Sequence, residues 1–244
     1  MDAANFNNMT LHQSFNTQEL PDGSYIIVGG IEGGVYTNKT LHYYQGYYYP
    51  KNPMKYPKTG HCTAFRTGSV WVMGGFMGQV INMVEVLDLH TGTWNDGPPL
   101  TIARTDASAC MIDSDSLYIF GGQNPNNPMG AILNSIEHLN FNTGLWMLFA
   151  IPMPSGLLSP VVAQISPSQI LVLGGNNGAD DVAEVKMFVR STGEWMNCSD
   201  LETPTRSIME CYYNNQQVHV FGGTTLPSDE PPLYVTYPFQ IVFQ

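Results

Sequence analysis

The segment Val70-Trp-Val-Met-Gly74-Gly75 is a short apolar run that ends in a pair of glycines. The same pattern returns four times elsewhere in the chain. Its other copies are Tyr25-Ile-Ile-Val-Gly29-Gly30, Leu117-Tyr-Ile-Phe-Gly121-Gly122, Ile170-Leu-Val-Leu-Gly174-Gly175 and Val218-His-Val-Phe-Gly222-Gly223. Successive glycine pairs lie 45, 47, 53 and 48 residues apart. This regular spacing indicates that the chain is built from tandem repeats.

A second motif keeps the same spacing. Three of the glycine pairs are followed by Thr-Gly-x-Trp, in Thr91-Gly-Thr-Trp94, Thr143-Gly-Leu-Trp146 and Thr192-Gly-Glu-Trp195. A β-branched or apolar run stands before each Thr-Gly, so this dipeptide predicts a hairpin turn between two strands. Another strand-like run precedes each glycine segment, as in His61-Cys-Thr-Ala-Phe65. The pattern therefore predicts four strands in each repeat.

The order of these markers resembles that of the kelch family, over roughly residues 11 to 244. The resemblance implies an all-β fold, a β-propeller of about five four-stranded kelch-type blades. We expect blades near residues 11–50, 58–98, 105–150, 158–200 and 206–244, after an N-terminal extension at residues 1–10. Paired glycines suit a tightly turning strand end, because glycine adopts positive φ and lets another backbone approach closely. One Trp per blade can fill the wedge between adjacent sheets.

The first and last repeats depart from this pattern. In the first, Tyr47-Tyr-Tyr49 occupies the Trp position, and in the last the Thr-Gly-x-Trp motif is absent. Kelch propellers usually resemble rings of six or seven blades, so closure with five has three alternatives. In the first alternative, which we favour, the five blades close the ring by themselves. In the second, the N-terminal extension adds a closing strand, and in the third, a partner protein completes the ring. An open sheet edge would invite pairing with other chains.

The charge of the chain limits its partners. A net charge of −11 would repel phosphate backbones and anionic lipid head groups, so we expect neither nucleic acid nor membrane as a partner. The amino terminus lacks a secretory pattern and no apolar run approaches the ~20 residues of a membrane span, so we expect a cytoplasmic protein. The four cysteines show no C-x-x-C spacing. We predict no metal site and no cofactor.

The candidate binding residues lie in two sets of loops. Loops that link blades, and loops from the second strand to the third, gather on one face of a propeller and form its usual binding surface. Arg104 and Arg206 stand at matching places in two linkers, with Lys58 roughly equivalent. The kelch resemblance gives such an Arg two alternative roles. It bonds neighbouring loops, which recurrence favours, or it grips a carboxylate of a partner through bidentate bonds.

Asparagines form a second candidate set on the same face. Asn124, Asn127, Asn176, Asn177 and Asp180 could recognise the backbone of a peptide. Turn formation is the stronger alternative, because Asn and Asp side chains readily bond their own backbone.

Three further groups have structural explanations that we favour. The tyrosine cluster could be an interface, although core packing of the first blade is the better explanation. The cysteines at matching inner-strand positions indicate packing rather than a metal or redox site. The charged residues at matching third-strand positions indicate a solvated face, since the charge changes sign. The members of these groups are, in the same order, Tyr43, Tyr44, Tyr47, Tyr48 and Tyr49; Cys62, Cys110 and Cys211; and Glu85, Glu137 and Lys186.

We predict that the chain is an intracellular protein-interaction module, a scaffold or adaptor that binds a segment of another protein, and that it is not an enzyme. One alternative is a carbohydrate-active hydrolase, whose chemistry needs two carboxylates about 5–10 Å apart in the central funnel. Acids at inner-strand positions are few, namely Glu19, Asp113, Asp115 and Glu210. The other alternative is a structural subunit of a larger assembly.

Overall fold

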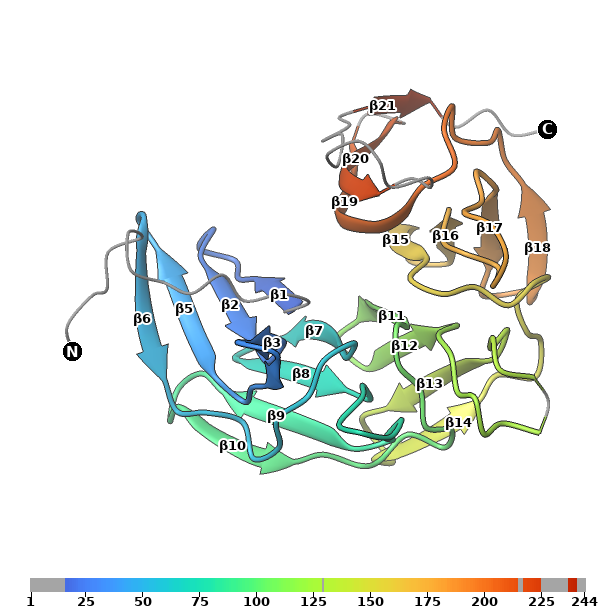
Figure 1. Ribbon diagram of the computed structural model, residues 1–244. Coiled ribbons are helices and arrows are strands. Elements are labelled where there is room, and N and C mark those ends of the chain that lie inside the picture. Colours follow the sequence, from blue (N-terminus) through green and yellow to red (C-terminus); the bar gives the residue numbers. More distant parts are fainter. Residues whose placement is uncertain (1–15, 129, 215–216, 225–236, 241–244) are drawn as a thin grey trace. The chain divides into compact units, whose positions relative to one another are not determined.

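The computed structural model describes residues 16–128, 130–214, 217–224 and 237–240, with the backbone alone for Asp113 and for residues from 207 onward. These residues form β-strands and the loops that connect them (Figure 1). None of them lies in a helix of the length and hydrophobicity needed to cross a membrane. The predicted extension at residues 1–10 falls outside the described residues.

The first two repeats each form a four-stranded antiparallel sheet whose strands pair in chain order. The first sheet consists of β1 (Asn16–Glu19), β2 (Tyr25–Val28), β5 (Thr40–Tyr44) and β6 (Tyr47–Lys51). The second consists of β7 (Cys62–Arg66), β8 (Ser69–Met73), β9 (Val84–Asp88) and β10 (Thr93–Asp96). A short hairpin of β3 (Ile31–Glu32) and β4 (Val35–Tyr36) is inserted between β2 and β5.

The next two repeats have the same topology. The third sheet consists of β11 (Ser108–Asp113), β12 (Ser116–Phe120), β13 (Ile136–Asn140) and β14 (Leu145–Leu148). The fourth consists of β15 (Val161–Ser166), β16 (Gln169–Leu173), β17 (Val185–Val189) and β18 (Glu194–Asn197). The prediction of all-β, four-stranded repeats is therefore confirmed.

The fifth repeat shows three strands among its described residues. They are β19 (Arg206–Asn214), β20 (Gln217–Thr224) and β21 (Tyr237–Gln240), paired in this order. Gly222 and Gly223 lie inside β20, whereas the other glycine pairs follow the end of their strand. The remaining predicted strand would fall among residues outside the described ranges.

The Thr-Gly motifs form the predicted hairpin turns. In each, the glycine has positive φ and its N–H donates to a carbonyl four residues earlier, as from Gly92 to Asp88 at 2.8 Å. The carboxylate of Asp88 also accepts the N–H groups of His90 and Thr91, at 2.8 and 3.0 Å. These bonds hold the turn because an Asp side chain can replace water at the turn amides.

The chain divides into two compact units, residues 1–106 with 140–146 and residues 107–139 with 147–244. Each unit has its own core, built from alternate residues of central strands. In the first unit, Ile26 and Val28 of β2 pack with Val70 and Val72 of β8 and with Leu87 of β9. Each of these side chains contributes roughly 1.5–3 kcal/mol by leaving water.

The second unit buries a larger and more aromatic core. Phe120, Ile136, Ile170, Val172 and Phe188 form its centre, and all are at most 2% exposed. A separate cluster on the other side of the fourth sheet contains Leu171, Leu173 and Met187, among others. The fourth sheet is therefore apolar on both faces, as expected of a sheet packed between neighbours.

Candidate binding surface

Each glycine pair of the first four repeats is closed by the linker that leads to the next repeat. The N–H of the second glycine donates to a linker carbonyl at 2.8–2.9 Å. A Cβ on the first glycine would lie only 2.2–2.6 Å from the same carbonyl. Positive φ and this close approach both require glycine. The four donor and acceptor pairs are Gly30 with Lys58, Gly75 with Arg104, Gly122 with Leu157 and Gly175 with Thr205.

The Trp residues anchor the same linkers from the outside. Trp94, Trp146 and Trp195 each donate their indole N–H to the linker that precedes their own repeat. The acceptors are the carbonyls of Asn52, Pro98 and Pro152, at 2.8, 2.9 and 2.9 Å respectively. Trp195 also packs on the Phe188 ring, with centroids 5.0 Å apart. The indole thus combines the predicted packing with a bond that fixes the linker.

The sequence interpretation missed a third anchor. An Asn two residues before the third strand donates its side-chain amide to the linker carbonyl of a deeply buried Met or Leu. The pairs are Asn38 with Met54, Asn82 with Leu100 and Asn134 with Met153, at 2.8, 2.9 and 3.4 Å. The recurrence of Asn at this place in three repeats was the available signal.

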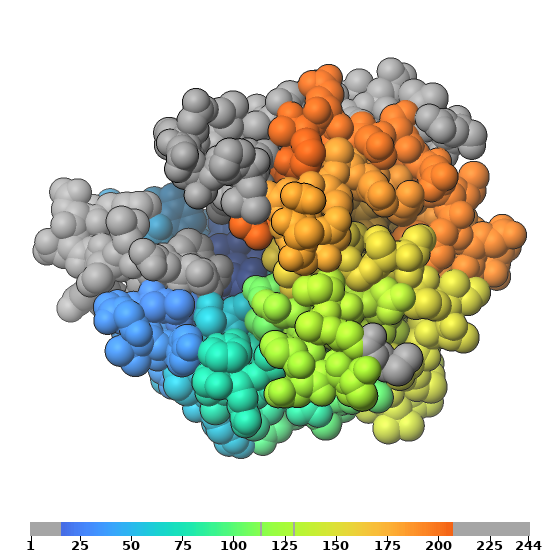
Figure 2. Space-filling model, turned by 45° about the vertical axis from the view of Figure 1, so that its right-hand side comes forward, coloured from blue at the N-terminus to red at the C-terminus, as the bar shows by residue number. Residues whose placement is uncertain are grey.

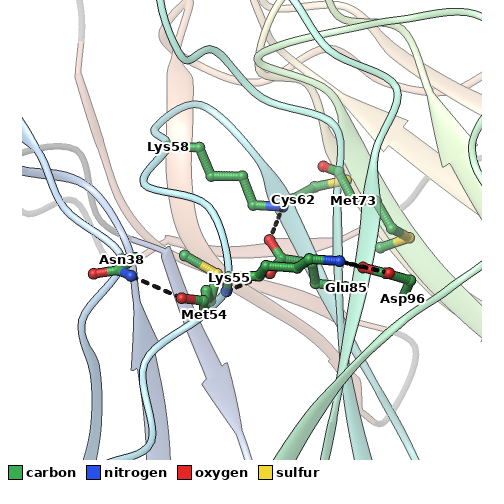
Figure 3. A network of polar contacts seen from close by, with 8 residues as sticks. All are labelled: Asn38, Met54, Lys55, Lys58, Cys62, Met73, Glu85 and Asp96. Carbon is green, nitrogen blue, oxygen red and sulfur yellow. Dashed lines mark hydrogen bonds and ion pairs between the residues drawn. The ribbon is translucent and has the colours of Figure 1, made fainter.

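Lys58 is a buried structural cation (Figure 3). Its Nζ lies 2.9 Å from Oε2 of Glu85, and the two side chains are 0% and 1% exposed. The other carboxylate oxygen of Glu85 accepts the backbone N–H of Lys55 at 2.7 Å. Burial lowers the pKa of Lys58, and the Glu85 charge opposes that change. Lys58 therefore faces no partner, and the predicted solvated position of Glu85 is wrong.

The matching third-strand residues differ from one another. Glu137 is fully buried, so the solvated position predicted for it is also wrong. Lys186 is partly exposed, and its Nζ contacts Glu184 at 3.4 Å and Asn197 at 3.0 Å. A buried carboxylate needs hydrogen-bond or ionic compensation, which a sequence pattern alone does not reveal.

The two candidate arginines are neither equivalent nor alike in exposure. The backbone bonds align Arg104 with Thr205, so Arg206 is one residue further along its linker, and the prediction of matching places is wrong. Arg104 is 1% exposed, which agrees with the structural alternative. The Arg206 side chain is 34% exposed, and its Nε lies 3.3 Å from the buried Asp181 carboxylate. Of the three predicted cations, Arg206 is thus the one at the surface.

The candidate asparagines mainly shape their own loops. Asn124 accepts the N–H of Asn126 at 3.0 Å, and the N–H of Asn127 donates to the Asn124 carbonyl at 2.9 Å. The yellow-green third repeat, which contains this loop, lies at the surface seen in Figure 2. These contacts favour turn formation, as expected of Asx turns.

The corresponding loop of the fourth repeat is fixed in the same way. Asn176 is 5% exposed and donates to Asp181 at 2.8 Å, while its Oδ1 accepts the N–H of Gly178 at 2.8 Å. Asn177 accepts two loop N–H groups, those of Ala179 and Asp180, both at 2.9 Å. Asn177 and Asp180 are exposed, so these two predicted residues lie together on an accessible, well-ordered loop.

Comparisons with known proteins agree with this repeated geometry. The kelch motif model matches residues 57–101, which span the second repeat. An F-box/kelch-repeat protein of Arabidopsis thaliana is 26% identical over 129 residues, covering 52% of this chain and 29% of that protein. The chain is a kelch-repeat β-propeller protein. The kelch-like protein terF of Aspergillus terreus is 23% identical over 187 residues, covering 70% of this chain and 40% of its own length.

A solved structure supports the same fold. The structure of YjhT superposes with a TM-score of 0.72 at 14% identity, covering 88% of this chain and 74% of that one. The kelch chain spans less than half the length of the curated relatives it matches. The similarity therefore establishes the fold and the repeat.

Within the first unit, the loops of the first two kelch repeats form one continuous edge. Thr59 of the linker exchanges backbone bonds with Phe76, at 3.1 and 2.7 Å. The Tyr36 ring meets the Phe76 ring edge-on, with centroids 5.8 Å apart. Val35, at the tip of the β3–β4 hairpin, is 68% exposed. This edge presents apolar and aromatic side chains on a backbone that hydrogen bonds hold in place.

The remaining predicted groups lie apart from these loops. Tyr43 and Tyr48 pack together at 5.0 Å, as expected of blade packing, whereas Tyr44 and Tyr47 are 39% and 47% exposed. Burial raises the pKa of the Cys62 and Cys110 thiols to about 12. The side chains that the structure describes include no cluster of three metal-ligating residues.

The structure describes the side chains of two of the four predicted inner-strand carboxylates. Glu19 is exposed at the end of β1, and Asp115 is exposed in the turn between β11 and β12. The side chains of Asp113, Glu210 and Cys211 lie outside the described residues. The hydrolase alternative therefore stays a prediction.

Proposed function

We propose that this kelch protein is a protein-interaction module that binds a segment of a partner protein on its loop edges. The observation that carries the proposal is the combination of ordered backbone and exposed side chains in these loops. Val35 in the first unit and Asp180 in the second are exposed, yet hydrogen bonds fix the loops beneath them. Such preorganisation lowers the entropy lost on binding.

The proposal excludes Lys58 and Arg104 as contact residues. Both are buried, so replacing them would disturb the fold and not the surface alone. The partner contacts are expected at the accessible side chains of the loops and, in the second unit, at the exposed part of Arg206. An Arg that already holds a carboxylate through Nε keeps other donors for a second acceptor.

Lysine substitutions in the proposed binding loops, compared with lysine substitutions in turns at the opposite ends of the strands, test this function. Partners are first purified from the native source on the wild-type chain, and the affinity of the purified partner is then measured. If the partner binds the loops of the first unit, Val35→Lys should weaken its binding at least tenfold. If it binds the loops of the second unit, Asp180→Lys should do so. The matched controls are Thr67→Lys and Ser191→Lys, at exposed turns at the opposite ends of the strands. Equal affinity of all four variants would refute binding at the loop edges.

A further inference from the structure

A buried histidine occupies the junction between the first two blades. His61 is 2% exposed and stands directly before β7. Its ring is confined by the glycine corners of both blades, because a Cβ on Gly29 would lie 2.7 Å from His61 Cε1, and a Cβ on Gly75 3.1 Å from His61 Cβ. The His61 side chain is therefore packed between the two glycine corners.

The same residue joins the inner strands of the two blades. The Asn16 side-chain amide of β1 donates to the His61 carbonyl. Two residues later, the Thr63 hydroxyl of β7 donates to the Thr17 carbonyl at 3.0 Å. The backbone of His61 is therefore part of the contact that keeps β1 against β7.

The surroundings of the ring suit a neutral imidazole and not an imidazolium. Neither ring nitrogen has a hydrogen-bond partner among the residues that the structure describes. Burial, and after it the Lys58 cation, lowers the His61 pKa to about 3, while a contact with the Val28 carbonyl that falls short of a hydrogen bond opposes this change. Glu85 is already engaged by Lys58 and by the Lys55 N–H.

The other titratable and charged groups of this region do not supply a counter-ion. The Cys62 thiol donates to the Met73 carbonyl at 3.7 Å and stays protonated, since burial raises its pKa to about 12. The Arg104 cation acts on the same thiol. Asp106 belongs to the next linker, with its Oδ1 3.1 Å from where a Cβ on Gly60 would lie, and it is not among the groups that shift the His61 pKa. A proton on His61 would therefore add an uncompensated buried charge.

We propose that His61 makes the junction of blades 1 and 2 an acid-sensitive joint, closed while the ring is neutral and opened when it is protonated. In the open form the ring meets water and regains an ordinary affinity for protons. Since that form binds a proton more readily than the closed form, the opening equilibrium rises about tenfold per pH unit below roughly pH 6.5. The joint does not depend on the proposed partner binding.

Hydrogen exchange of the whole chain between pH 7.5 and 5, corrected for intrinsic rates, tests the joint. In the wild type, protection of the amides of Gly30, Thr37 and Lys58 should fall about 30-fold by pH 5, whereas amides of β16 and β17 should keep theirs. His61→Phe removes the titrating group at similar size and should abolish the response. His42→Phe is the matched control, because His42 is partly exposed and bonds Ser24 at 2.9 Å, and it should keep the response.

An acid response that persists in His61→Phe, or that is absent from the wild type, would overturn the proposal. If the phenylalanine variant does not fold, the ring titration of His61 in the wild-type chain decides, followed by NMR. A ring that takes up its proton near pH 6.5 with the blade contacts intact contradicts the joint. A ring that stays neutral until the blade 1 amides lose protection supports it.

Discussion

At the scale of single residues, Gly74 shows why the repeat marker is a glycine and not merely a small residue. Its φ is +64°, and a Cβ would lie 2.4 Å from the Arg104 carbonyl oxygen. The obstacle is backbone, which cannot swing aside as a side chain end would. In the first four repeats, the first glycine of the pair is therefore determined by a linker roughly thirty residues further along the chain, as the 2.8 Å bond from Gly75 to Arg104 shows.

A pair of alanine substitutions separates this contact from the cost of positive φ. Gly78 has a φ of +88° but open space around the added Cβ, so Gly78→Ala should cost about 1 kcal/mol of unfolding free energy. Gly74→Ala adds the backbone clash and should cost about 3 kcal/mol or more. Urea unfolding of both variants measures the difference. Equal losses would show that the linker moves aside freely.

At the scale of elements, strands and hairpin turns were predictable because their signals are local. Alternating apolar runs and Thr-Gly turns specify β8 to β10 within a few residues of sequence. The linkers were not predictable, because their shape follows from bonds to other segments, such as the Asn82 amide to the Leu100 carbonyl. A Lys in a proline-rich linker is also expected to be exposed, and only the folded structure brings Lys58 next to Glu85.

This ion pair ties a linker to the third strand of the following blade, so its loss should act on both elements. Lys58→Met leaves the Glu85 carboxylate buried without its cation and should cost about 3–5 kcal/mol of unfolding free energy. Adding Glu85→Gln removes that charge and keeps an acceptor for the Lys55 N–H. The double variant should therefore recover at least half of the loss in urea unfolding. Additive losses from the two single changes would contradict a coupled pair.

At the scale of the whole molecule, the chain has few charged residues and buries four of them. Only 12% of the residues are charged, and Lys58, Glu85, Arg104 and Glu137 are buried. The pH dependence of unfolding should therefore be dominated by buried groups and not by the net charge of −11. Among the buried groups, His61 contributes on the acid side of neutral pH, and the thiols and Lys58 contribute on the alkaline side.

The thiols and Lys58 act with opposite signs above neutral pH. A thiol with a folded pKa of about 12 keeps a proton that the unfolded chain loses above about pH 9, so stability falls as pH rises. Lys58, whose folded pKa is lowered, loses its proton earlier in the folded state, so its contribution rises with pH up to about 10.5. Cys110 belongs to the second unit, and Lys58 is not among the groups that shift its pKa, so Cys110 reports the thiol effect alone.

We therefore expect Cys110→Ala to flatten the alkaline loss of stability. Between pH 9 and 10.5 the wild type should lose up to about 1.4 kcal/mol per pH unit for each thiol whose folded pKa is raised, and the variant should lose that much less. Urea unfolding under reducing conditions at pH 8, 9 and 10 measures both slopes. Parallel slopes would mean that the Cys110 thiol ionises in the folded chain, and hence that the core of the second unit admits water at high pH.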